Sequence, residues 1–165
     1  MTERGKTNKR LDPRDIPDVL RQARSLHREG QSAEAAALFD AILAIAPRHV
    51  HALHYRGVAA WQRGQHAEAV ALITRALAAN PDSPSAHNNL GNALRDLKRL
   101  EEALASYGHA VALRPVYPGA LCNQGHVLAD LKRHEEALAA FEAAIAAEPG
   151  YADAHLGRGD ALRNL

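Results

Sequence analysis

Ten histidines and a single cysteine are the residues of this sequence whose chemistry could support a reaction or a metal site. His51 and His54 lie three positions apart and would share one face of a helix, while His87 and His126 occur later in the chain. A zinc site needs three or four converging ligands with supporting partners, and no carboxylate is placed to complete such a set. We therefore expect no metal and no other cofactor. The histidines are interpreted as solvated or packing groups, whose titration could weaken or strengthen ligand binding between about pH 5 and 7.

Cys122 is the one candidate nucleophile, because His126 follows one helical turn later and a thiolate beside a charged histidine is activated. However, the sequence offers no identifiable oxyanion hole, orienting acid or substrate pocket for it. The phosphate-loop, His-Glu-x-x-His and Gly-x-Ser-x-Gly motifs are absent. The alternative is that Cys122 is simply a small helical residue. We predict that this chain is not an enzyme in itself.

Composition narrows the class of protein further. The 165 residues are 47% hydrophobic but only 4% aromatic, with alanine as the commonest apolar residue, which suits closely packed helices. A formal charge of +1 argues against nucleic acid and against a basic membrane anchor. The polar start has no signal-peptide apolar region, and no long apolar run predicts a membrane span. With no second cysteine for a disulfide, we predict a soluble, cytoplasmic protein.

An internal repeat of 34 residues organises the chain, and several columns of similar residues keep this spacing. The residues in these columns are Pro47, Pro81, Pro115 and Pro149; Ala23, Gly57, Gly91, Gly125 and Gly159; Ala35, Ala69, Ala103 and Ala137; Phe39, Ile73, Tyr107 and Phe141; and Ile42, Ala76, Ala110 and Ala144. The segments 84–117 and 118–151 share more than half of their residues. Each unit contains two apolar periodic stretches of about 13 residues around a short polar turn, which predicts two antiparallel helices.

Each column has a physical role in such a hairpin. The Gly or Ala in the first helix and the first Ala of the second let the two helices approach closely, and the aromatic or Ile residue fills the wider space beyond. The Pro ends the second helix. No hairpin buries its apolar face alone, so the units must stack and share one core. We predict an all-α, right-handed superhelical solenoid of antiparallel helix pairs, with four full repeats and one extra C-terminal helix.

These columns resemble the tetratricopeptide repeat (TPR) family at its own spacing, over about residues 16–165. The predicted organisation is a disordered polar arm over 1–14 and a repeat domain over 15–165, with repeats 16–49, 50–83, 84–117 and 118–151 and a partial repeat 152–165. The turn between the helices has Gly30 and Gly64 in the first two repeats but Lys98 and Lys132 in the next two. If these lysines are left-handed, each costs about 1 kcal/mol relative to glycine.

The resemblance implies that the first helices line a concave groove and contact the ligand. The groove residues it implies are Arg21, Arg24, His51, His54, Tyr55, Asn88, Asn89, Asn92, Arg95, Asn123 and His126, with Asp153 and Asp160 beyond them. The lining is polar, basic near the N-terminus and rich in amides in the middle. Asn89 and Asn123 form one column, which Tyr55 and Gly157 interrupt.

This asparagine pair resembles the TPR arms of bacterial O-GlcNAc transferase-type proteins, in which such amides hold the backbone of an extended peptide. An amide offers both a donor and an acceptor, so recognition of this kind tolerates many peptide sequences. The alternative is that the asparagines only tie adjacent repeats together. The lysine-rich clamp for chaperone C-termini, another binding mode of the family, does not match this sequence.

We therefore predict a scaffold or adaptor that binds an extended peptide or a helix of a partner protein in its groove. The alternative function is the substrate-docking arm of a larger enzyme such as an O-GlcNAc transferase-like glycosyltransferase. Nucleic acid, a membrane and a cofactor are not expected partners. The last helix carries Leu156, Ala161, Leu162 and Leu165 without a second helix to cover them. We expect that this helix is an imperfect cap, that the chain continues, or that the helix pairs with its copy in a homodimer.

Overall fold

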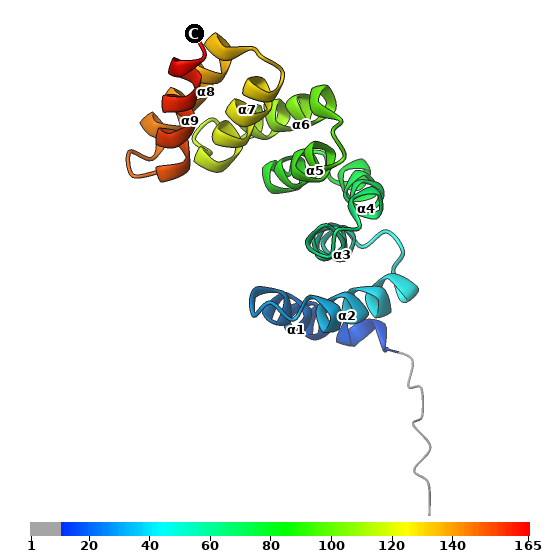
Figure 1. Cartoon of the computed structure of the whole chain (residues 1–165). Helices are drawn as coiled ribbons and strands as arrows, with labels where there is room; N and C mark the ends of the chain where they lie inside the picture. Colours follow the sequence, from blue (N-terminus) through cyan, green and yellow to red (C-terminus); the bar gives the residue numbers. More distant parts are fainter. Residues whose placement is uncertain (1–10) are drawn as a thin grey trace, which may run out of the picture.

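The computed structural model describes residues 11–165, which contain nine α-helices and no strand. The helices are α1 (Ile16–Arg28), α2 (Ser32–Ile45), α3 (Val50–Gln62), α4 (His66–Ala79), α5 (Pro84–Asp96), α6 (Leu100–Leu113), α7 (Pro118–Asp130), α8 (His134–Ala147) and α9 (Ala152–Arg163). Consecutive helices pack as hairpins, and each hairpin packs on the next. The result is an open arc with the odd-numbered helices along its inner side and the even-numbered helices outside (Figure 1). The prediction of an all-α solenoid with four full repeats and an extra helix is confirmed.

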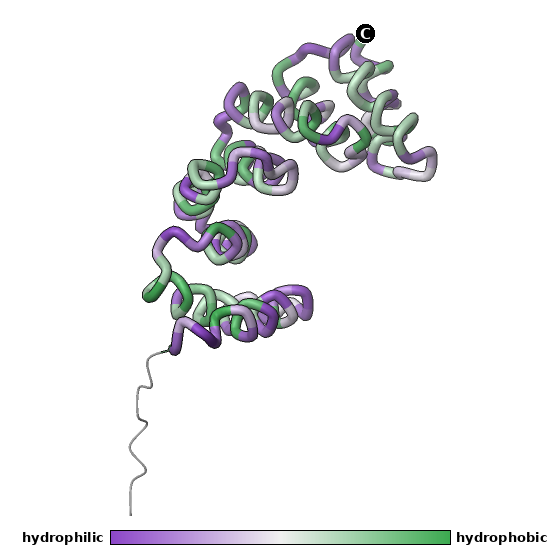
Figure 2. The backbone as a smooth tube through the Cα atoms, turned by 180° about the vertical axis from the view of Figure 1, so that it is seen from behind, coloured by the Kyte–Doolittle hydropathy of each residue, from purple (hydrophilic) through white to green (hydrophobic). Residues whose placement is uncertain are grey.

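The repeat columns form the core between the two helix layers. Phe39, Ile73, Tyr107 and Phe141 are all fully buried. A methyl group on Gly91 would lie 2.5 Å from the Tyr107 ring, and one on Gly125 would lie 2.7 Å from Phe141. The small residue in the first helix is therefore required by the large side chain that faces it. Hydrophobic and hydrophilic residues alternate along the helices (Figure 2), and none of the helices in residues 11–165 combines the length and apolarity needed to cross a bilayer.

The turns inside the hairpins have the left-handed conformation that the sequence suggested. Gly30 and Gly64 have φ of 80° and 76°, and Lys98 and Lys132 have φ of 61° and 62°. The lysines therefore adopt a backbone conformation that costs about 1 kcal/mol more for them than for glycine. Between hairpins, Ser83 caps α5 by accepting a hydrogen bond from the backbone N–H of Ala86, at 3.3 Å.

Residues 11–14, the part of the predicted polar arm that the structure describes, lie against the first repeat. Residues 1–10 of that arm lie outside the described residues. Pro13–Asp15 form a short 3-10 helix, with the Asp12 side chain accepting a hydrogen bond from the backbone N–H of Arg14. Leu11 packs against the core of the first repeat. Because of these contacts, the repeat domain is extended at its N-terminal end by residues 11–14.

Candidate functional site

The residues that the sequence predicted to bind a ligand all lie on inner helices of the arc, whose concave side is called the groove below. Arg21 and Arg24 lie on α1 and the remaining nine on α3, α5 and α7, all of them inner helices (Figure 1). Their exposure differs widely. Arg21, Arg24 and His51 are exposed, whereas His54 and Asn88 are buried.

Three asparagines form a hydrogen-bonded cluster between α5 and α7. Asn123 Nδ2 donates to Asn88 Oδ1 at 3.1 Å and to Asn92 Oδ1 at 3.2 Å. The Tyr107 hydroxyl donates to the same Asn92 oxygen at 2.8 Å, and burial raises the pKa of this phenol, so it stays a donor. Adjacent repeats are therefore joined through the amide donors of Asn123. Within the described residues its own carbonyl oxygen accepts no hydrogen bond.

Asn89 repeats this arrangement one unit earlier, against α3. Its Nδ2 lies 3.0 Å from His54 Nε2, so an uncharged His54 accepts a hydrogen bond from the amide. Burial lowers the pKa of His54 to about 4, helped by the charges of His51 and His27. His54 is therefore neutral at physiological pH and does not titrate in the range from pH 5 to 7 that the sequence suggested for the histidines.

The asparagine column lies partly in the core, which explains where it stops. Tyr55, one repeat before Asn89, stacks on the buried Phe39 ring with 5.9 Å between ring centres. Gly157, one repeat after Asn123, leaves room for Phe141, whose ring would lie 2.4 Å from an added methyl group. At both of these positions the column residue therefore lies against the large residue of the preceding outer helix.

Positive charge gathers at the α1 end of the groove. A shallow cavity of about 300 Å³ is lined by Pro17, Leu20, Arg21, Arg24 and Arg28. The Arg24 guanidinium lies 5.1 Å from the centre of the Tyr55 ring, a cation–π distance that holds it over the groove. This end can attract an anionic group, and Asp153 at the far end, on α9, has the opposite charge.

Cys122, His126 and Asp153 meet at the far end of the groove. The sequence suggested a thiolate activated by His126, but burial raises the pKa of Cys122 to about 12, and the nearby Asp153 carboxylate adds to the shift. For Asp153, burial raises the pKa but is outweighed by the hydrogen bond and charge of His126, so the net shift is downward. His126 Nε2 faces both partners, at 3.6 Å from Cys122 Sγ and 3.1 Å from Asp153 Oδ2. A catalytic relay needs the two ring nitrogens to face different partners, so this is not a nucleophile and base pair.

Asp153 is the residue that the sequence reasoning did not connect to its partners. The expectation that no carboxylate completes a histidine set is wrong at His126. The 34-residue period could have indicated this contact, because it fixes which residues of adjacent inner helices lie side by side. Inner helices of adjacent repeats bring together residues 31 or 35 positions apart, as for Cys122 with Asp153 and Asn123 with Asn88.

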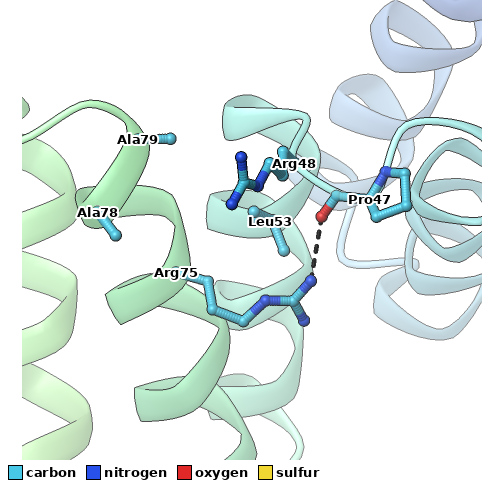
Figure 3. A pocket seen from close by; sticks show the side chains of 6 residues that line it. All are labelled: Pro47, Arg48, Leu53, Arg75, Ala78 and Ala79. Atoms are coloured by element: carbon cyan, nitrogen blue, oxygen red, sulfur yellow. Dashed lines mark hydrogen bonds between the residues drawn. The ribbon is translucent and has the colours of Figure 1, made fainter.

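A second hollow lies away from the predicted groove residues, at the junction of the first two repeats. It is a cavity of about 480 Å³ whose lining residues are Pro47, Arg48, Leu53, Arg75, Ala78 and Ala79. Arg75 of α4 reaches across it and donates to the carbonyl oxygen of Pro47 at 3.0 Å (Figure 3). This contact ties the turn between α2 and α3 to the second repeat.

Comparison with known proteins identifies the class of this solenoid. A family model of the tetratricopeptide repeat matches residues 20–84, 56–118 and 122–165, and the chain belongs to this family. No curated protein sequence matches the chain significantly.

Among solved structures, the chain is similar to the MamA protein, with a TM-score of 0.83 and 22% identity over 93% of this chain and 84% of that one. It is also similar to YrrB, described as a TPR protein with an unusual peptide-binding site, with a TM-score of 0.76 and 26% identity over 88% and 75% of the two chains. The first TPR of Spaghetti (RPAP3), bound to the HSP90 peptide SRMEEVD, matches with a TM-score of 0.68 and 25% identity over 69% and 90%.

Proposed function

We propose that this chain is a protein-interaction scaffold that binds an extended segment of a partner protein in its concave groove. The observation that carries the proposal is the orientation of Asn89 and Asn123. The amide nitrogen of each donates a hydrogen bond to the preceding repeat, from Asn89 to His54 at 3.0 Å and from Asn123 to Asn88 at 3.1 Å. Within residues 11–165 neither carbonyl oxygen accepts a hydrogen bond. Two fixed acceptors on successive repeats suit the backbone N–H groups of an extended peptide.

This geometry combines the two sequence interpretations of the asparagines. Their donors tie adjacent repeats together, and their acceptors point to peptide binding. Recognition through backbone N–H groups carries no side-chain preference, so the groove tolerates many sequences. Each amide is already held by internal hydrogen bonds, one for Asn89 and two for Asn123, so its acceptor loses little side-chain entropy on binding.

Charge gives the bound segment a direction. The three arginines of α1 form a basic end, and Asp153 lies at the other end of the groove, so a peptide with acidic residues toward α1 is favoured. The similar Spaghetti domain binds the acidic HSP90 peptide SRMEEVD. The present groove lacks the lysine clamp pattern, so we propose attraction of acidic segments in general rather than capture of that C-terminus.

The test uses peptides selected from a random display library on the immobilised protein, then synthesised with a fluorophore. Asn89→Ala combined with Asn123→Ala should raise the dissociation constant roughly tenfold or more, because two hydrogen bonds of about 0.5–1.5 kcal/mol each are lost. Asn80→Ala, in an exposed turn, is the matched control. Circular dichroism at the assay temperature checks folding, since each asparagine substitution also removes an internal hydrogen bond. Equal affinity of the double variant and the control would place the binding surface elsewhere.

The outer face of α9 supports a second interaction. Leu156, Leu162 and Leu165 are 71%, 56% and 59% exposed. Gly159 occupies the column of Gly91 and Gly125, yet nothing lies within 4 Å of where its methyl group would be. We propose that this unfilled space and its leucines receive a helix from a second copy. Light scattering should then find a dimer that Leu162→Asp converts to a monomer, and a monomeric parent protein would contradict the proposal.

The alternative function is the substrate-docking arm of a larger enzyme, such as an O-GlcNAc transferase-like glycosyltransferase. The pair of asparagine acceptors and the same open face of α9 favour it. A blot of source cells with an antibody to this chain distinguishes the two cases. A band far above 17.8 kDa supports the arm, and a band at that mass supports the stand-alone scaffold.

A further inference from the structure

The cluster of Cys122, His126 and Asp153 brings three different metal-ligand atoms to one point. Sγ lies 3.6 Å from His126 Nε2 and 3.4 Å from Asp153 Oδ2, and these last two atoms are 3.1 Å apart. Cys122 and His126 come from one face of α7, four residues apart, and Asp153 comes from the first turn of α9. The three atoms form a small triangle rather than a chain of hydrogen bonds.

The triangle has the dimensions of three corners of a zinc tetrahedron. With usual bond lengths for sulfur, nitrogen and oxygen, tetrahedral angles place sulfur about 3.6 Å from each of the other two ligands and those two about 3.4 Å apart. The observed separations agree to within roughly 0.3 Å, so no backbone movement is needed for an ion to enter. Hydrogen bonding alone accounts for the contacts pairwise, but it does not require one ring nitrogen to serve both partners.

Burial places such an ion at the groove surface. Cys122 is 1% exposed and forms the floor, whereas the side chains of His126 and Asp153 are 34% and 59% exposed. The fourth corner of the tetrahedron therefore faces the groove, where water or a partner side chain can reach it. Three protein ligands with an open fourth position are the pattern of an accessible zinc site rather than a closed structural one.

Electrostatics favours a dication at this point. A thiolate and a carboxylate repel each other, and an ion with two positive charges neutralises the pair. Arg95 also acts on both Cys122 and Asp153, and its positive charge works against the ion. The mixed sulfur, nitrogen and oxygen set suits a borderline metal such as zinc and not the oxygen-seeking magnesium or calcium.

We propose that Cys122, His126 and Asp153 bind a zinc-class divalent cation at the α7–α9 end of the groove, with one coordination position open to a ligand. This site is independent of the asparagine acceptors and does not require the proposed peptide binding. When the metal binds, the thiol proton is released to solvent and the Sγ–metal bond takes its place.

The test is a Co²⁺ titration of the reduced, tag-free full chain, followed by the near-ultraviolet charge-transfer band that arises only from a thiolate–cobalt bond. The proposal predicts a band that saturates at one ion per chain and disappears when Zn²⁺ is added. Asp153→Asn and His126→Gln should each weaken binding at least about tenfold, since each removes one of three ligands. His51→Gln is the matched control for adventitious binding by the other histidines, and it should leave the titration unchanged.

Thermal unfolding with and without Zn²⁺ provides a second readout, because binding to the folded state alone raises the midpoint. The rise should be present in the parent protein and in His51→Gln and absent in Asp153→Asn, whose exposed side chain makes misfolding of the variant a minor concern. The absence of a thiolate band, or a band and a midpoint rise that Asp153→Asn leaves unchanged, would mean adventitious histidine binding only and would overturn the site.

Discussion

His54 should make the stability of this protein depend on pH in a window set by its burial. The side chain is 7% exposed, and burial with the charges of His51 and His27 lowers its pKa from 6.5 to about 4. The unfolded chain therefore binds the proton more tightly than the folded chain. The contribution to stability is complete above about pH 6.5, falls as the pH drops and is lost by about pH 4. A shift of this size corresponds to about 3 kcal/mol at most.

The assay is urea denaturation at pH 7.5 and pH 4.5. Between these values the parent protein should lose about 2.5 kcal/mol of unfolding free energy through His54. His54→Gln cannot titrate, so it should lose that much less than the parent over the same interval. His109→Gln is the control, because His109 is exposed on α6 and its charge is not among those that act on His54, so this variant should keep the full dependence. If His54→Gln and the parent show the same loss, His54 is not held neutral by burial.

Protonation of His54 would also alter the groove. Neutral Nε2 accepts the hydrogen bond from Asn89, whereas a protonated ring can only donate. The Asn89 amide must then turn its oxygen toward His54, which removes one of the two peptide acceptors. Peptide affinity should fall over the same acidic window as stability, and affinity that stays constant while stability falls would argue against Asn89 as an acceptor.

Three further predictions concern packing and turns. Lys98→Gly should stabilise the chain by about 1 kcal/mol in urea denaturation, because it relieves a left-handed lysine; a loss would mean that the lysine side chain makes a compensating contact. Gly125→Ala should destabilise by roughly 1–3 kcal/mol because of the Phe141 ring, whereas Gly159→Ala, with open space around it, should stabilise by about 0.5–1 kcal/mol; equal effects would refute the packing argument. Ala103→Leu should lower the thermal midpoint through a cost of roughly 1–3 kcal/mol, since Ala103 is fully buried in the third repeat, and an unchanged midpoint would show that the hairpin can open there.

The 34-residue period was sufficient to predict the fold because the role of each column follows from contacts within a single repeat. A glycine opposite a large buried residue, as for Gly91 and Tyr107, is a local steric rule that recurs with the period. The left-handed turn lysines were predictable in the same way, since Lys98 occupies the column of Gly64. These features depend on contacts inside a hairpin.

Contacts between hairpins were harder to predict, because they join different columns. Asp153 meets Cys122 across a spacing of 31 residues, so sliding the sequence by 34 does not align them. The depressed pKa of His54 depends on burial by neighbouring repeats, which residue type does not show. The direction of the asparagine amides likewise required the positions of His54 and Asn88.

The length of the asparagine column should be adjustable by changing the outer helix beneath it. A methyl group added at Gly157 would lie 2.4 Å from the Phe141 ring, and one added at Gly125 would lie 2.7 Å from the same ring. The ring therefore leaves no room for a side chain at residue 157. Gly157→Asn alone should therefore destabilise the last repeat by roughly 1–3 kcal/mol. Asn89 follows a unit whose large residue is Ile73 and Asn123 follows one whose large residue is Tyr107, so the closeness of the Phe141 ring to residue 157 is particular to the last repeat.

Phe141→Ile should consequently make room for an asparagine at 157. Phe141→Ile alone leaves a cavity, and Gly157→Asn alone overfills the site, so the double variant should be more stable than the sum of the two losses by about 0.5–3 kcal/mol. A double-mutant cycle in urea measures this coupling. Strict additivity would mean that the ring does not occupy the space beside residue 157, and the steric explanation for the end of the asparagine column would fail with it.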